Sequence, residues 1–182
     1  EIPLRLVGSE MCIRDSEEGW YKKALDTDLA RPKFAIMNPE ITYTLPDYQT
    51  QCGCADIMMH TMERYFVLED TMEITDKIAQ DVMKNVMKYA KILKKDPENY
   101  EARAEIMWCG SLSHNGLTGC GTCGGDWATH LIEHELGGMF DVAHGAGLAA
   151  VWGSWARYVM DEKPERFAQF AVDVMGCLLY TS

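Results

Sequence analysis

The stretch Cys54–Phe66, CADIMMHTMERYF, places an aspartate and a histidine four residues apart in an apolar segment. Residues four apart on an α-helix share a face, so the side chains of Asp56 and His60 can reach one point. A buried carboxylate without a compensating charge costs several kcal/mol. The segment therefore predicts a buried helix on which Asp56 meets a positive charge.

Three more histidines occur in DWATHLIEHELGGMFDVAHGAGLA, residues 126–149. His130 and His134 are four apart on a predicted helix, and His144 begins the next segment. A single histidine on an apolar helix is more often a hydrogen-bonded core residue than a ligand. A carboxylate together with several imidazoles is the donor set that iron or zinc accepts. The combination therefore favours a metal site over an ordinary core.

The rest of the chain predicts a mostly helical protein from Tyr48 onward. Asp96 and Asp126 are predicted N-caps of two helices, and Gly137-Gly138 is predicted to end the second. Only KFAIM, Lys33–Met37, has the pattern of a buried strand. A single strand has no partner, so it suggests a domain that precedes this sequence.

Composition restricts the class of protein. The 182 residues are 47% hydrophobic and 25% charged, as in a globular domain. A net charge of -11 argues against nucleic acid or an anionic membrane as a partner. No apolar run reaches the roughly 18 residues that a membrane span needs. Seven cysteines, an odd number, with twelve methionines predict reduced thiols and a cytoplasmic location.

The stretch 126–149 and NPEITYTLPDYQTQCGCADIMMHTMERYF, residues 38–66, resemble the iron-containing (group III) alcohol dehydrogenases, close to the butanol dehydrogenase branch. The resemblance runs from about Glu17 to Gly176. The family binds its metal through an Asp-x-x-x-His motif and two histidines fourteen apart. The resemblance therefore implies these metal ligands: Asp56, His60, His130 and His144. Asn38 departs from the family, in which many members have an acidic residue there.

The resemblance also implies a fold, a reaction and a catalytic residue. The fold would be a partial helical metal-binding domain of the dehydroquinate synthase-like type, with the last strand of a missing N-terminal α/β domain. The reaction would interconvert a small alcohol and an aldehyde, with Fe(II) or Zn(II), and with NAD(P)H in a full-length homodimeric parent. His134 matches a family histidine near the nicotinamide and the substrate, which implies that it relays a proton.

We expect four segments along the chain. The ends VGSEMCIRDS and CLLYTS resemble translated sequencing-adapter DNA, so residues 1–16 and 177–182 are expected to be non-native extensions. Residues 17–46 would be the end of a nucleotide-binding α/β domain, and residues 47–176 an incomplete helical catalytic domain. Such a fragment is expected to bind metal without turning over substrate.

Four further features have competing interpretations. GCGTCG, Gly119–Gly124, spells a dinucleotide fingerprint, but it follows a predicted helix and is expected to be a turn. Glu63 either pairs with Arg64 at the surface or steadies a metal ligand. His114 is expected to bind carbonyl groups at a helix end or to approach the cleft. A second, thiolate metal site is the less favoured interpretation of four cysteines: Cys52, Cys54, Cys120 and Cys123.

Alternatives to the dehydrogenase are a non-catalytic helical metal-binding protein, a metal-dependent phosphohydrolase and a lyase of the dehydroquinate synthase type. A helical phosphohydrolase usually has an adjacent His-Asp pair, which this sequence lacks. Glycines close to the predicted ligands favour an open pocket over a closed structural site: Gly137, Gly138, Gly145 and Gly147.

Overall fold

The computed structural model describes residues 11–13, 23–25, 33–69 and 71–178. These form α1 (Asp47–Tyr65), α2 (Glu73–Leu93), α3 (Tyr100–His114), α4 (Ala128–Phe140), α5 (His144–Val159) and α6 (Pro164–Asp173). Two 3-10 helices, η2 (Pro39–Thr42) and η3 (Leu117–Gly119), and the antiparallel strands β1 (Met11–Ile13) and β2 (Lys23–Leu25) complete the described elements. The helical class is confirmed. No helix in the described ranges is both long and apolar enough to cross a membrane.

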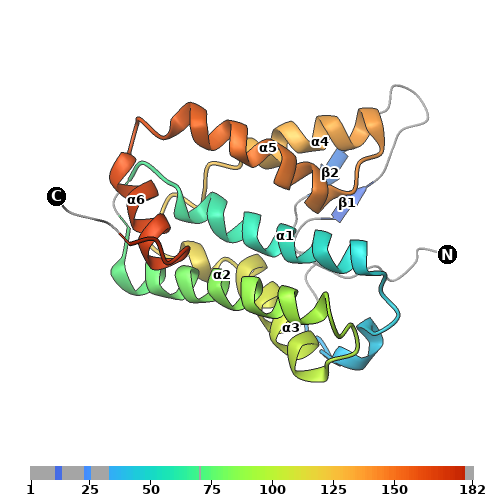
Figure 1. The fold of residues 1–182 in the computed structure, drawn as a ribbon. Coiled ribbons are helices and arrows are strands. Elements are labelled where there is room, and N and C mark those ends of the chain that lie inside the picture. The colour runs from blue at the N-terminus through green and yellow to red at the C-terminus, as the bar shows by residue number, and fades with distance from the viewer. Residues whose placement is uncertain (1–10, 14–22, 26–32, 70, 179–182) are drawn as a thin grey trace.

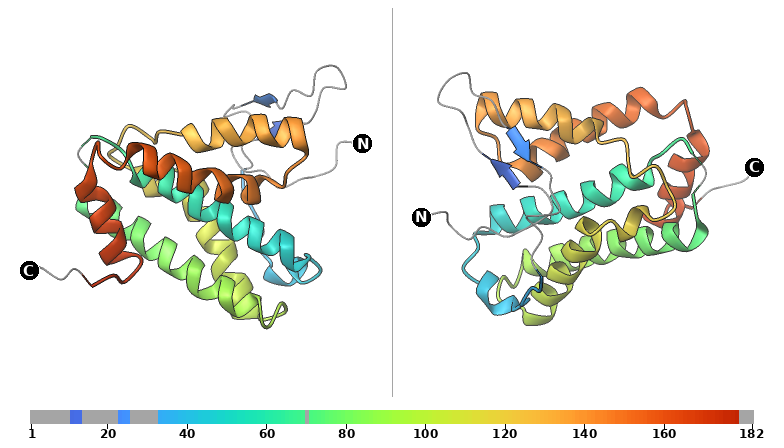
Figure 2. Two further views of the ribbon diagram at one scale, coloured as in Figure 1. Left: turned by 45° about the horizontal axis from the view of Figure 1, so that its top comes forward. Right: turned by 180° about the vertical axis from the view of Figure 1, so that it is seen from behind.

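Helix α1 lies in the middle of the helical body, with α2 and α3 on one side and α5 with α4 on the other (Figure 1). The two further views keep these pairs on opposite sides of α1 (Figure 2). A helix covered on several sides must be apolar around most of its circumference. The sequence of α1 meets this need, since Ile57, Met59 and Met62 are all buried. The predicted helix of the opening stretch is therefore the centre of the fold.

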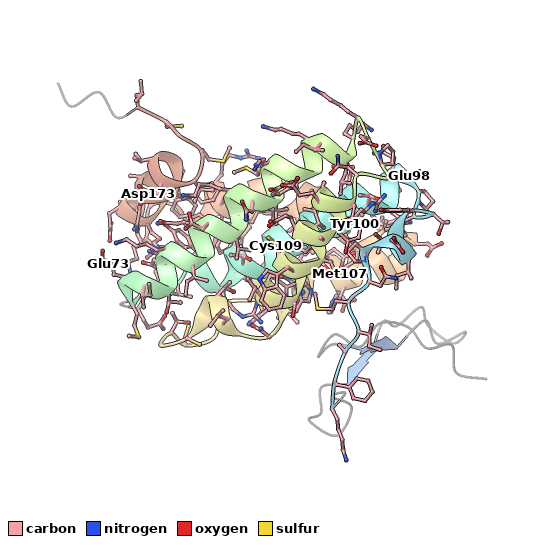
Figure 3. All side chains as sticks on the ribbon, turned by 90° about the horizontal axis from the view of Figure 1, so that it is seen from below. Glu73, Glu98, Tyr100, Met107, Cys109 and Asp173 are labelled. Atoms are coloured by element: carbon pink, nitrogen blue, oxygen red, sulfur yellow. The ribbon has the colours of Figure 1, made fainter. Side chains whose placement is uncertain are left out.

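Two apolar clusters attach α1 to α2. Met62 and Met83 belong to the first cluster, and Ile57, Val82 and Val86 belong to the second. Figure 3 shows the α2–α3 layer from below, with Glu73 and Asp173 marking the end near α6, and Glu98 and Tyr100 the opposite end. This layer fixes α1 in place, so the polar residues on the other face of α1 have a rigid support.

An ion pair joins α6 to α2. The guanidinium of Arg166 donates two hydrogen bonds of 2.6 Å to the two carboxylate oxygens of Asp76. Its Nε donates to the Tyr65 carbonyl at 2.8 Å, and the guanidinium carbon lies 3.6 Å from the centre of the Tyr65 ring. Thr71 donates a further hydrogen bond to Asp76. Both charges are thus satisfied by neighbours within the chain.

The prediction of a buried strand at Lys33–Met37 is wrong. These residues form no strand, and the side chains of Phe34 and Ile36 are 79% and 83% exposed. Figure 3 shows this segment leaving the helical body. A buried strand needs a neighbouring strand for its backbone and a packed layer for its side chains. The described residues provide neither at this segment.

The predicted ends of α3 and α4 also need correction. The side chain of Asn99, not Asp96, caps α3, and the carboxylate of Asp96 instead accepts a hydrogen bond from the side-chain amide of Asn99. Helix α4 begins after Trp127, and Asp126 instead donates its backbone N–H to the Glu63 carbonyl. The helix then continues through Gly137-Gly138 to Phe140, since glycine weakens a helix by only about 1 kcal/mol per residue.

Candidate metal centre

Four helices bring one carboxylate and four imidazoles together around the part of α1 that holds Asp56 and His60. Asp56 and His60 come from α1, one turn apart. His114 is the last residue of α3, His130 lies in the first turn of α4, and His144 is the first residue of α5. Helix ends therefore supply most of the donors, and α1 supplies the carboxylate at their centre.

The distances within this cluster are uniform. Asp56 Oδ1 lies 3.6 Å from His60 Nε2, 3.8 Å from His130 Nε2 and 3.5 Å from His144 Nε2. These separations are too long for hydrogen bonds. Two ligand atoms bound about 2.1 Å from one metal ion at a tetrahedral angle would be about 3.4 Å apart. The spacing therefore fits donors that share a cation.

Burial and charge support the same conclusion. Asp56 Oδ1 and His130 Nε2 are buried and have no hydrogen-bond partner among the described residues. Burial alone would raise the pKa of Asp56, but contacts with His114 and His130 lower it well below its usual range. Burial and the neighbouring His114 lower the pKa of His60 to about 2. An ionised carboxylate beside neutral imidazole is suitable for a divalent transition metal.

The outer nitrogens of two imidazoles are fixed by buried glutamates. Glu63 accepts hydrogen bonds from the Nδ1 of His130 at 3.1 Å and from its backbone N–H at 3.2 Å. Glu133 contacts the Nδ1 of His144. Burial lowers the pKa of His130, but Asp56 and Glu63 outweigh it and raise this pKa to about 9. Asp56 and Glu63 thus favour a positive charge at the Nε2 of His130, the nitrogen that faces Asp56.

The two interpretations of Glu63 are now distinguishable. Glu63 is 2% exposed and belongs to the cluster, whereas Arg64 donates to the carbonyls of His60 and Ser113 at 2.8 Å. Sequence reasoning missed Glu133, which is fully buried. The available signal was an acidic residue three positions after His130, on the same face of the predicted helix.

Two glycines let α5 approach the rest of the site. A Cβ atom at Gly145 would lie 1.9 Å from the carbonyl oxygen of Cys52, so α5 packs directly on the backbone of α1. A Cβ atom at Gly147 would lie 2.7 Å from the Cγ of Glu133. Real atoms do not approach so closely. The glycines after His144 therefore allow this histidine to reach Asp56.

His134 lies at the edge of the cluster. Its ring centre is 5.5 Å from that of His144, and donor atoms of Glu133, His134 and His144 lie within 4.8 Å of one another.

His114 bonds the Gly110 carbonyl through Nδ1 and also faces Asp56. No cysteine occurs in the candidate metal-binding groups of the described residues.

The GCGTCG stretch lies in the connection between α3 and α4. It overlaps the end of η3, and Gly121 and Gly124 have φ angles of 79° and 93°. Positive φ suits glycine and produces tight turns. No strand comes directly before it in the described chain, so the context that a dinucleotide fingerprint requires is not met.

Comparisons with known proteins agree on one family. The model of the Fe-containing alcohol dehydrogenase family, C-terminal, matches residues 50–180. NADH-dependent butanol dehydrogenase A of Clostridium acetobutylicum is 37% identical over 179 residues, which cover 96% of this chain and 46% of that protein. An NADPH-dependent aldehyde reductase of Escherichia coli is 35% identical over 150 residues, 82% of this chain and 38% of that protein.

A solved structure extends the match to three dimensions. The crystal structure of NADH-dependent butanol dehydrogenase A from Thermotoga maritima superposes with a TM-score of 0.90 at 35% identity. The alignment covers 96% of this chain and 44% of that one. The chain thus spans less than half the length of the relatives that it matches.

Proposed function

The chain belongs to the Fe-containing alcohol dehydrogenase family, and on this basis we propose that it carries the metal-binding part of an NAD(P)-dependent alcohol dehydrogenase or aldehyde reductase. One observation carries the proposal. Three imidazole Nε2 atoms lie within 3.8 Å of the buried Oδ1 of Asp56, at distances suited to a shared cation. The substrate would be a small alcohol or aldehyde, as the names of the relatives indicate for those proteins.

Four side chains would hold the metal in this proposal: Asp56, His60, His130 and His144. Catalytic zinc more often has three protein ligands, so a set of four favours Fe(II) while remaining suitable for Zn(II). A divalent metal bound there supplies Lewis acidity to the oxygen of the alcohol or aldehyde. Glu63 and Glu133 hold two of the rings with Nε2 directed at Asp56, which keeps the site organised before binding.

We assign proton transfer to His134. It lies one turn after His130 on α4, and its ring centre is 5.5 Å from that of His144. Imidazole is the side chain best suited to proton transfer near neutral pH. In this role His134 would exchange the hydroxyl proton of the substrate with solvent, while the four ligands stay in place.

The dinucleotide site belongs to the full-length parent in this proposal. No glycine-rich loop joins a strand to a helix in the described part of the chain, and a net charge of -11 repels the phosphates of NAD(P)H. Positioning the nicotinamide against the substrate is worth on the order of 10 kcal/mol. The present chain should therefore bind metal without catalysing hydride transfer.

The test uses this chain and a full-length parent. Each is loaded with Fe(II) or Zn(II) and desalted, its metal content is measured, and the absorbance of NADH or NADPH is followed with butanal. We expect about one metal ion per chain in both proteins, and nicotinamide oxidation only by the parent. A parent that retains metal without oxidising either cofactor would indicate a non-catalytic metal-binding protein. Steady turnover by the present chain would place the cofactor site within it.

A further inference from the structure

His114 faces the same carboxylate, Asp56, as the three histidines of the proposed ligand set. Its Nε2 is 3.6 Å from Asp56 Oδ2, and its ring centre is 3.8 Å from that of His60 with the planes 30° apart. The side chain of His114 is 26% exposed, which equals the value for His144. In its position and burial, His114 resembles the histidines of the proposed ligand set, although it comes from the end of α3.

Hydrogen bonds determine which nitrogen of His114 faces Asp56. The Nδ1 lies 2.9 Å from the carbonyl oxygen of Gly110, which can only accept a hydrogen bond. Nδ1 therefore carries a proton and donates it, with the hydroxyl of Ser113 2.7 Å from the same nitrogen. Nε2 is then the nitrogen that faces Asp56 Oδ2, and their separation of 3.6 Å is longer than a hydrogen bond and suits two ligand atoms of one cation.

Two of the proposed ligands have the same arrangement. The Nδ1 atoms of His130 and His144 contact carboxylate oxygens, and their Nε2 atoms lie 3.8 Å and 3.5 Å from Asp56. An outer nitrogen held by a carboxylate or a carbonyl oxygen is the usual condition of a ligating imidazole. We propose that His114 is a fifth protein ligand of this metal through Nε2, an inference that rests on the proposed function above.

A single ion explains these contacts better than two ions. The Nε2 of His60 faces Asp56 Oδ1, the oxygen that His130 and His144 also face. A second ion at Oδ2 would need His60 together with Asp56 and His114, but the Nε2 of His60 already faces Oδ1 beside His130 and His144. Five protein donors would suit Fe(II) more readily than Zn(II), which prefers four ligands.

The experiment counts imidazoles directly. The chain is loaded with Fe(II) in the absence of oxygen, the metal-to-protein ratio is measured, and X-ray absorption at the iron edge gives the number of imidazole ligands. The wild-type chain should bind about one ion through about four imidazoles. His114→Ala should lose one imidazole, and competition with a chelator should show at least about tenfold weaker binding. The matched control His134→Ala, which removes an imidazole outside the proposed set, should keep the wild-type count.

A second variant separates ligation from a hydrogen bond to Asp56. The amide of glutamine reaches near the Nε2 position of histidine but is a weaker iron ligand than imidazole, so His114→Gln should bind iron as weakly as His114→Ala. Wild-type affinity in His114→Gln would overturn the inference, as would two ions per chain. A wild-type count of about three imidazoles would overturn it even if a variant failed to fold. That count would leave the proposed function intact, whereas a wild-type chain that bound no metal would refute both.

Discussion

Two carboxylates of this chain, the buried Asp76 and the half-buried Asp56, are surrounded in opposite ways. Asp76 has both oxygens 2.6 Å from the guanidinium of Arg166. Asp56 has imidazole Nε2 atoms 3.5 to 3.8 Å away, and no lysine or arginine of the described chain forms an ion pair with it. The first carboxylate is neutralised by a cation from its own chain, and the second is surrounded by groups that bind a cation.

The difference between these sites shows how a structural charge differs from a functional one. Short, two-pronged contacts between Asp76 and Arg166 stabilise the attachment of α6 and leave no space for an ion. The longer separations around Asp56 would be unfavourable in a site that had only a structural purpose, because a buried charge without a partner destabilises the fold. Substitutions in the two sites should therefore affect different properties of the protein.

The largest effect is expected from Asp56→Asn. Asparagine keeps the size of the side chain but removes the negative charge that faces the three Nε2 atoms. After loading and desalting, the metal content should fall from about one ion per chain to nearly zero. Asp81→Asn, in an exposed ion pair with Lys84 on α2, is the control and should retain metal. Full retention by Asp56→Asn would exclude Asp56 as a ligand.

Asp76→Asn should lower the stability of the fold and leave metal binding unchanged, which is the reverse of the effect expected from Asp56→Asn. It leaves the buried guanidinium of Arg166 without its partner, so the free energy of unfolding of the metal-free chain should fall by about 3 kcal/mol. Urea unfolding measures this change, and metal retention under native conditions should stay at the wild-type value. Glu73→Ala, which removes an exposed ion pair with Lys77, should leave the urea midpoint unchanged. Loss of metal in Asp76→Asn without loss of stability would contradict the comparison.

The sequence predicted what depends on local periodicity. The four-residue spacing of Asp56 and His60 placed them on one face, and α1 forms as that spacing requires. The resemblance to the family, which the comparisons confirm, supplied the order of the remaining histidines.

Features that depend on distant parts of the chain could not be predicted in this way. Glu133 and His114 join the cluster because α4 and α3 meet at α1, and no short-range pattern records that meeting. Lys33–Met37 has a strand-like composition, but a strand forms only beside a partner. The expected extensions at residues 1–16 and 177–182 lie mostly outside the described residues, and their origin stays a prediction.

A smaller effect on the metal site is expected from Glu63→Gln. The amide oxygen can still accept from the Nδ1 of His130, but the negative charge that favours this orientation is lost. Metal affinity, measured by competition with a chelator, should weaken by about tenfold to a hundredfold without abolishing binding. Glu135→Gln, at an exposed position of α4, is the control and should bind metal as the wild-type chain does. Unchanged affinity in Glu63→Gln would show that the hydrogen bond alone orients the ring.

The smallest effect concerns the pH dependence of the structural pair. Burial alone would raise the pKa of Asp76. Hydrogen bonds from Arg166 and Thr71 outweigh this effect, so the pKa in the folded state lies below the usual value. Such a carboxylate stabilises the fold fully above its unfolded pKa of about 3.9, and this stabilisation is lost as the pH falls through the folded pKa. The difference in unfolding free energy between the metal-free wild-type chain and Asp76→Asn should therefore be constant from about pH 5 to pH 7 and shrink below about pH 4. Urea unfolding at a series of pH values measures it, with Asp81→Asn as the exposed control. A difference that grew toward low pH would mean that the Arg166 contact does not favour ionised Asp76, and the contrast with Asp56 would then need another explanation.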